Sequence, residues 1–187
     1  MLGFFIWTNT ILVIYYLDKL FKVVQNGNKW DKVGKGGNMA GMLLGQFEAV
    51  LGDKSRIAFP KKLREILGKK LIVTLGYENS LIIVGEEGWK ALLEGTEGKP
   101  FIQKGARETQ RYLLGGASFV QLDDKGRFVI PDYLRRFAKI KREVIFLGLS
   151  RYAELWDKEI WESYKQNLEK NIDKISQKLI EGEKKNE

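Results

Sequence analysis

From residue 43 onward, apolar residues occur in short runs that glycine, proline or charged residues interrupt. Short apolar runs with such boundaries are typical of β-strands. Two lysine- and arginine-rich segments follow a proline and place leucine on one face, which predicts short helices. A short strand is predicted before each of the turns at 52–55 and 123–126. The further predicted strands are 57–59, 71–75, 81–84, 128–130, 143–149 and 153–156, and the predicted helices are 61–67 and 132–138.

Further segments carry helix signals. Helices are predicted to begin near Glu86 and Asp157, because acidic residues suit a helix N-terminus. The segment 104–117 is predicted as a helix that Gly115 and Gly116 end. The segment 161–180 is predicted as a long helix, because its apolar residues recur at spacings of three and four. That apolar face consists of Leu168, Ile172, Ile175 and Leu179.

The pattern occurs twice. FEAVLGDKSRIAFPKKLREIL (47–67) aligns with FVQLDDKGRFVIPDYLRRFA (119–138). Arg56 then matches Arg127, and Pro60 matches Pro131. Beyond the helices the offset increases by one, so that Val73, Leu75 and Gly76 match Ile145, Leu147 and Gly148, and Trp89 matches Trp161. An internal repeat of about 70 residues predicts two copies of one small module.

The duplication predicts the fold class. A module of about 45 residues with four short strands buries too little surface to fold alone, so we expect the two copies to close one β-barrel. The class is α+β, mainly β, with a pseudo-two-fold axis, peripheral helices and a long C-terminal helix. The predicted segments are an extension at 1–41, a first module at 42–95, a connecting helix at 96–117, a second module at 118–162, and the C-terminal helix and tail at 163–187.

The amino-acid composition excludes several kinds of catalytic and metal site. The chain of 187 residues contains no cysteine and no histidine. Disulfides, thiolate metal sites and serine–histidine pairs are therefore excluded, and we expect no metal, cofactor or small-molecule ligand. The net charge of +8 favours a polyanionic partner.

Basic residues gather at the matched turns and helices. Arg56 and Arg127 follow the two turns directly. Arginine binds phosphate and also reads guanine through O6 and N7, so these residues are candidate DNA contacts. The alternative interpretation is that they are solvated surface charges. The candidate DNA-binding residues are Arg56, Arg127, Lys54, Lys125, Arg64 and Arg135.

Three aspartates at the same turns permit an enzymatic interpretation. Asp53, Asp123 and Asp124 would then act as acid and base. Aspartate in a tight turn normally bonds to its own backbone instead. We therefore predict a structural role for these residues and no enzymatic activity.

Four segments resemble the MraZ family of bacterial transcriptional regulators. They are MLLGQFEAVLGDKSRIAFPKKLRE, RYLLGGA, VQLDDKGRFVIPDYLRRFA and GLSRYAELWDKEIWESY. The family's DxxxR turn motif is intact from Asp123 to Arg127. In the first copy, Gly52 replaces the aspartate and Ser55 replaces the glycine before the arginine, which puts the geometry of that turn in question.

The resemblance implies a fold and a function. The fold is an AbrB-type swapped-hairpin β-barrel with both halves in one chain. The function is that of a cytoplasmic, nucleoid-associated repressor, a ring-shaped homo-oligomer on double-stranded DNA. Its sites are repeated TGGG-type boxes about 10 base pairs apart, upstream of its own operon of cell division and cell wall genes.

Residues 1–41 have two interpretations. The apolar stretch at 4–17 is short for a membrane span, which needs about 20 residues. The segment NGNKWDKVGKGGNM (26–39) permits TGGG in its coding DNA about every 10 nucleotides, near one turn of B-DNA. We therefore predict that residues 1–38 are a translated operator, with translation starting at Met39 or Met42. The alternative is a membrane anchor followed by a glycine-rich linker.

Two further function classes stay open. An AbrB-like antitoxin or adaptor would bind a partner protein through the C-terminal helix. A membrane-anchored protein would use the segment at 4–17.

Overall fold

The computed structural model describes residues 42–93 and 103–183 of the chain, with thirteen helices and strands of regular structure besides a short 3-10 turn. The first copy contains β1 (Leu43–Val50), β2 (Arg56–Ala58), α2 (Lys61–Leu67), β3 (Lys70–Leu75), β4 (Leu81–Val84) and α3 (Glu86–Leu93). The helix α4 (Lys104–Gly115) connects the copies. The second copy contains β5 (Ser118–Gln121), β6 (Arg127–Val129), α5 (Asp132–Phe137), β7 (Glu143–Ser150), β8 (Tyr152–Asp157) and α6 (Lys158–Glu183).

The chain divides into two units. One is Gly41–Asn167, and the other combines Met1–Ala40 with Leu168–Glu187. Of the second unit, the structure describes only the C-terminal part of α6. The predicted apolar face of this helix is open there, since Ile172 and Ile175 are 52% and 37% exposed.

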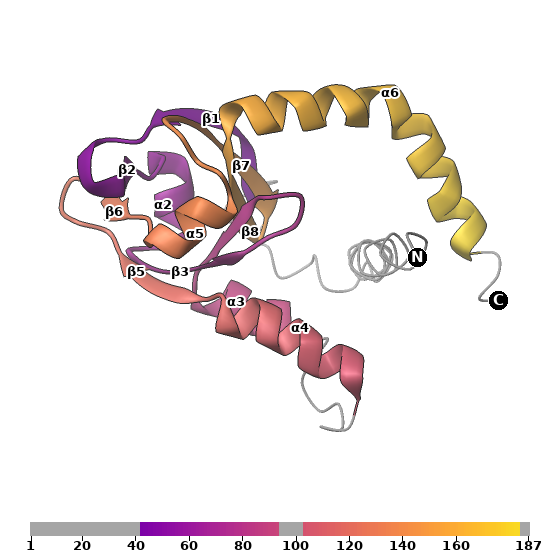
Figure 1. The fold of residues 1–187 in the computed structure, drawn as a ribbon, viewed down its shortest axis with the longest axis horizontal. Coiled ribbons are helices and arrows are strands. Elements are labelled where there is room, and N and C mark those ends of the chain that lie inside the picture. The colour runs from indigo at the N-terminus through magenta and orange to yellow at the C-terminus, as the bar shows by residue number, and fades with distance from the viewer. Residues whose placement is uncertain (1–41, 94–102, 184–187) are drawn as a thin grey trace, which may run out of the picture. The chain divides into compact units, whose positions relative to one another are not determined.

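The two copies are interleaved in the Gly41–Asn167 unit (Figure 1). Six antiparallel strands form one sheet in the order β1-β7-β8-β4-β3-β5, and β2 pairs with β6 in a separate ribbon. The pairs β1–β7, β3–β5, β4–β8 and β2–β6 each join one copy to the other. The predicted interleaving of the copies is therefore found. In the described residues the hydrogen-bonded ladder is open at β1 and β5.

The β2–β6 ribbon contains the pseudo-two-fold axis. Ile57 pairs with Phe128, and these residues occupy the same position in the two copies. The hydrogen bonds on either side match: Phe59 N donates to Gly126 O, and Ile130 N donates to Ser55 O, both at 2.9 Å. Each turn therefore meets the strand that leaves the other turn.

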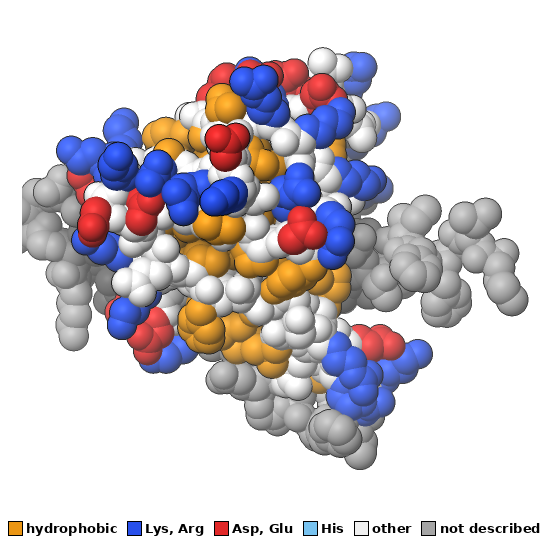
Figure 2. Space-filling view, turned by 60° about the vertical axis from the view of Figure 1, so that its left-hand side comes forward, with side chains coloured by type: hydrophobic (Ala, Val, Ile, Leu, Met, Phe, Trp, Pro, Cys, Tyr) orange, Lys and Arg blue, Asp and Glu red, His pale blue; other side chains and the backbone are white. Residues whose placement is uncertain are grey.

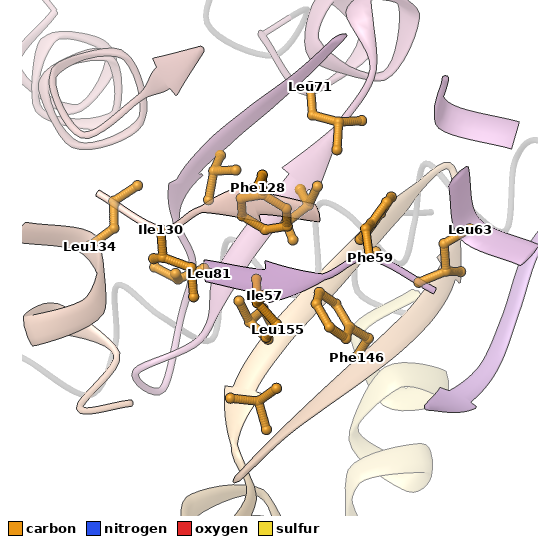
Figure 3. Close-up of a cluster of buried hydrophobic side chains, with 14 of the residues drawn as sticks. Ile57, Phe59, Leu63, Leu71, Leu81, Phe128, Ile130, Leu134, Phe146 and Leu155 are labelled. Carbon is orange, nitrogen blue, oxygen red and sulfur yellow. The ribbon is translucent and has the colours of Figure 1, made fainter. Parts of the chain in front are cut away.

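One core holds the ribbon, the helices α2 and α5 and the inner face of the sheet together (Figure 3). Leu63 of α2 and Leu134 of α5 are 1% and 0% exposed. The strand β7 is apolar on both faces: Val144 and Phe146 join this core, whereas Ile145 and Leu147 pack with Trp156 beneath the first turns of α6. Burial on both faces explains why the β7 sequence shows no alternation.

The third strands of the two copies match with an offset one residue larger than the sequence alignment predicts. Leu122 N donates to Lys69 O, and in the other copy Leu51 N donates to Arg142 O, so Lys69 corresponds to Arg142. Val73 then corresponds to Phe146, and not to Ile145 as predicted. Both Val73 and Phe146 face the core, whereas Ile145 faces α6. A slip of one residue along a strand moves each side chain to the other face of the sheet. The alignment did not detect this slip, because β7 is apolar on both faces.

The predicted helices are present. The predicted helix at 104–117 corresponds to α4, and the predicted helix at 161–180 lies within α6. Within residues 42–93 and 103–183, none of the helices has an apolar stretch long enough to cross a membrane. The segments at 4–17 and 26–39, on which the anchor and operator interpretations rest, lie outside the described residues.

Candidate nucleic-acid interface

The second turn is organised by the carboxylate of Asp123. Its Oδ1 accepts hydrogen bonds from the backbone N–H groups of Lys125 and Arg127 at 3.0 and 2.9 Å. The backbone also closes the turn, because Gly126 N donates to Asp123 O at 2.8 Å. Gly126 has a φ of 72°, which a glycine adopts without strain. The structural role predicted for Asp123 is confirmed.

The same carboxylate holds the side chain of Arg127. Arg127 Nε donates to Asp123 Oδ2 at 2.9 Å, and Nη2 lies 2.8 Å from this oxygen. These hydrogen bonds lower the pKa of Asp123 below its ordinary value, so the carboxylate is ionised at neutral pH. The guanidinium has five N–H donors, so some of them stay available to donate hydrogen bonds to a ligand. About a third of each side chain is exposed.

The first turn has the same backbone closure but no carboxylate at the matching place. Gly52 N donates to Arg56 O at 2.8 Å, as Asp123 N does to Arg127 O. Lys54 and Ser55 have φ values of 56° and 55°, in the left-handed region that favours glycine. In the described parts of the chain, the structure records no ion pair for Arg56, which is exposed.

Arg56 and Arg127 lie on the same outer face of the ribbon. In the register, Arg56 is opposite Val129 and Arg127 is opposite Ala58, so the two arginines are diagonal neighbours. Diagonal neighbours in an antiparallel pair are about 7–8 Å apart. The residues between them on the other face, Ile57 and Phe128, are buried, which fixes the arginine face outward. Figure 2 shows Lys and Arg side chains in a band across the side of the molecule that carries the ribbon.

Arg64 of the first copy lies against the turn of the second copy. A side chain at Gly126 would collide with the Arg64 guanidinium, so the guanidinium occupies the space that the glycine leaves open. Arg64 and Arg127 are therefore brought together at one turn, although they come from different copies.

Arg135, which matches Arg64, has different partners. Its Nη2 donates to Asp132 Oδ1 at 3.1 Å, and its Nε is buried without a hydrogen-bond partner. Asp132 also pairs with Arg136 at 3.2 Å. Ser55 stands where the second copy has Gly126 and carries the Cβ that Gly126 lacks.

Sequence reasoning named the cationic side chains as candidates but did not predict all the groups that position them. All six candidate residues are present at or next to the two turns and on α2 and α5. The positioning roles of Gly126 and Asp132 were missed, because both depend on contacts that the alignment of one copy with the other does not display. Within the described residues, no cluster of three or more acidic side chains is arranged to hold a metal ion.

Comparison with known proteins agrees with the duplicated architecture. A family model described as MraZ protein, antitoxin-like, matches the chain twice, at residues 42–112 and 113–181. A protein of Caldanaerobacter subterraneus subsp. tengcongensis named transcriptional regulator MraZ is 38% identical over 138 residues, which cover 74% of this chain and 96% of the relative. Proteins with the same name from Thermoanaerobacter sp. and Heliobacterium modesticaldum are 39% and 31% identical over 74% and 75% of this chain, and 96% and 98% of theirs.

Two interleaved copies of a four-stranded module, each with an arginine directly after its first turn, define the class of duplicated swapped-hairpin proteins. Within this class, the chain belongs to the MraZ family.

Proposed function

We propose that the protein is a sequence-specific regulator of transcription that binds double-stranded DNA through the outer face of the β2–β6 ribbon. The observation that carries the proposal is the placement of two matched arginines, Arg56 and Arg127, as diagonal neighbours on one exposed face. The relatives named transcriptional regulator MraZ support the same function.

The ribbon has dimensions that suit DNA. The major groove of B-DNA is about 12 Å wide and admits a two-stranded β-ribbon. The outer face of the ribbon would enter the groove, where guanine offers O6 and N7 to a guanidinium. Lys54, Lys125, Arg64 and Arg135 lie at the turns and on the flanking helices, where they would contact phosphates and set the register of the protein on the duplex.

The DNA site in this proposal is a series of TGGG boxes about one helical turn apart, upstream of the protein's own operon of cell division and cell wall genes. The protein would repress that operon as a ring of identical subunits in the nucleoid. Boxes that recur with the helical period present the same groove on the same side of the duplex. Subunits that each bind weakly would then act together, because the first contact raises the effective concentration for the next.

A binding assay with matched duplexes tests the proposal. Fluorescence anisotropy compares a duplex carrying tandem TGGG boxes with a scrambled duplex of equal length and composition. The native protein is expected to bind the tandem duplex at least tenfold more tightly, and the double variant R56A/R127A is expected to lose this preference. Arg151→Ala serves as the control, since Arg151 is an exposed arginine in the turn between β7 and β8. Equal affinity of the native protein for both duplexes would refute the proposal.

A second candidate function is that of an antitoxin-like adaptor. The family description and the exposed Ile172 and Ile175 of α6 favour it. This function predicts a discrete dimer in light scattering, a stable complex with a partner protein, and loss of that complex in the variant I172S/I175S with DNA affinity unchanged.

A further inference from the structure

We infer that the two arginine-bearing turns are not equivalent: the turn with Asp123, Gly126 and Arg127 reads bases, and the turn with Arg56 supplies phosphate contacts. In this assignment, Asp123 and Gly126 are positioning residues for sequence discrimination. The inference rests on the proposed function and specifies how it is divided between the two copies.

The first observation is that only one arginine is held in place. Arg127 is bound through Nε and Nη2 to Asp123 Oδ2, and Asp123 is itself fixed by two backbone N–H groups. The matching residue in the first copy is Gly52, so Arg56 has no such carboxylate. A guanidinium that is already oriented loses little conformational freedom on binding, and its planar fork then discriminates between acceptor geometries. An arginine that is not held in one orientation can contact a phosphate in many geometries, and therefore discriminates little between them.

The second observation is that the second turn has a glycine where the first turn has a serine, and that an arginine from the helix of the other copy lies against this glycine. Gly126 has no side chain, and the Arg64 guanidinium lies in the space that a Cβ would fill. Ser55 carries a Cβ at the matching position, with a φ of 55°. The recorded side-chain partner of Arg135 is Asp132, on its own helix.

The third observation is a charge difference between the two helices. Asp132 at the start of α5 pairs with both Arg135 and Arg136, at 3.1 and 3.2 Å. The matching residue at the start of α2 is Lys61, a cation that pairs with Glu65 and offers Arg64 no carboxylate. Within the described residues, the structure records no ion pair for Arg64. The Asp132 carboxylate thus compensates part of the positive charge of Arg135 and Arg136, whereas Arg64 has no carboxylate of this kind on its own helix.

These three differences act in the same direction. The second turn presents an oriented fork, Arg127, beside an uncompensated cation, Arg64. The first turn presents Arg56 without a restraint. Base contacts specify sequence, whereas phosphate contacts add affinity that depends on salt. Removal of Arg127 should therefore reduce discrimination, and removal of Arg56 should reduce affinity for every duplex.

The experiment measures two quantities for each variant: the ratio of Kd for scrambled over tandem-box DNA, and the slope of log Kd against log salt concentration. Arg127→Ala is expected to lower the ratio by roughly 5- to 150-fold, the discrimination of one bidentate contact. Arg127→Lys keeps the charge and loses the fork, so the ratio should fall while the slope is kept. Arg56→Ala is expected to leave the ratio unchanged and to reduce the slope by about one.

Asp123 and Gly126 are tested with conservative replacements. Asp123→Asn keeps an oxygen for the two backbone N–H groups and loses the charged partner of Arg127. It is expected to lower the ratio at least fivefold while affinity for scrambled DNA and the melting temperature stay the same. A merely structural role would weaken binding to both duplexes together. Gly126→Ser is expected to lower the ratio by displacing Arg64, and the reciprocal Ser55→Gly serves as the matched control with an unchanged ratio.

Equal loss of the ratio in Arg56→Ala and Arg127→Ala would overturn the inference while leaving the proposed function intact. A native protein that does not distinguish the two duplexes would instead refute the proposed function, and the inference with it. Unchanged ratios in both Asp123→Asn and Gly126→Ser would show that these two residues do not contribute to sequence discrimination.

Discussion

Ile57 and Phe128 face each other across the β2–β6 ribbon at the same position of their respective copies. Both are buried, at 1% and 2% exposure, and Phe128 contacts Phe59 edge to face at a centroid distance of 6.1 Å. The pseudo-two-fold axis passes between them, so this pair sets the spacing of the two arginines on the opposite face of the ribbon.

Truncation of this pair should be costly. Phe128→Ala is expected to lower the free energy of unfolding by about 3–5 kcal/mol, and Ile57→Ala by about 2–5 kcal/mol, because each leaves a cavity in the core. The measurement is urea denaturation followed by tryptophan fluorescence. Val129→Thr on the outer face keeps the β-branched shape and should stay within about 0.5 kcal/mol of the native protein. A Phe128→Ala protein of native stability would show that the ribbon is not packed as described.

Replacement by alanine should change the stability of the protein in opposite directions at two glycines whose added Cβ would meet no other atom. Gly68 ends α2 at φ 80° and ψ −163°, a region that is essentially restricted to glycine. Gly68→Ala is expected to destabilise the protein by about 1–3 kcal/mol, although no atom lies within 4 Å of the added Cβ. Gly105 is equally open but lies within α4. Gly105→Ala should therefore stabilise by up to about 1 kcal/mol. Thermal unfolding of both variants distinguishes backbone strain from steric space, because a loss in both would point to crowding.

The turn lysines should contribute to the salt dependence of DNA binding and not to its specificity. Lys54→Gln and Lys125→Gln are each expected to reduce the slope of log K against log salt by about 0.9, with the preference for tandem boxes unchanged. Lys90→Gln is the control, because Lys90 lies on α3 and pairs with Glu86 at 3.1 Å. Lysine variants with a native slope would show that the turns do not approach phosphates.

Glu154 should make stability depend on pH. Burial raises the pKa of Glu154 to about 7, and the charge of Glu78 acts in the same direction. The Trp156 indole N–H, which donates to Glu154 Oε2 at 2.9 Å, opposes this shift. Because the folded chain then holds a proton that the unfolded chain releases near pH 4.5, the free energy of unfolding should fall as pH rises from about 4.5 to 7.

The size and the control of this effect follow from the same linkage. The loss should reach at most about 3 kcal/mol and level off above pH 7. Glu154→Gln keeps an acceptor for Trp156 and should flatten the profile between pH 5 and 8, with a gain in stability at pH 8. Asp123 adds no slope in this range, since its lowered pKa keeps it ionised in both states. A profile that is equally steep in Glu154→Gln would assign the dependence to another group, with Glu78 the first to test.

The local motifs of the fold could be predicted from the sequence. Proline before a leucine-containing basic segment predicted α2 and α5, and the matched turns predicted Arg56 and Arg127 as equivalent residues. These predictions hold because the relevant interactions are short in sequence, from the turn to its flanking strand or from proline to the helix it opens.

The register of the third strand could not be predicted in this way. Two additional residues, Ile140 and Lys141, follow α5 in the second copy, and the hairpin between β7 and β8, counted between equivalent residue pairs, is one residue shorter than that between β3 and β4. Similar apolar residues on both faces of β7 allowed an alignment one residue out of register. Only the hydrogen bonds of Leu51 and Leu122 to the other copy resolve it.

The sequence offered candidate cationic residues but did not predict how these residues are arranged. Arg64 was named as a candidate DNA contact without a predicted neighbour, whereas its guanidinium lies over Gly126 of the other copy. That contact follows from the pairing of β2 with β6, which brings the helix of one copy to the turn of the other. The pairing joins two strands that are distant in sequence, so the sequence of either copy alone contains no local pattern that predicts the contact.

The interleaved strand order also has a consequence for synthesis. Leu43 in β1 pairs with Ser150 in β7, and β2 pairs with β6, so the early strands have no permanent neighbour until the second copy is made. At the elongation rates of ribosomes, that interval is on the order of 5–20 s. A nascent chain in this interval presents unpaired strand edges and apolar side chains that attract chaperones or other nascent chains. Rapid translation through the second copy would therefore protect the yield of folded protein.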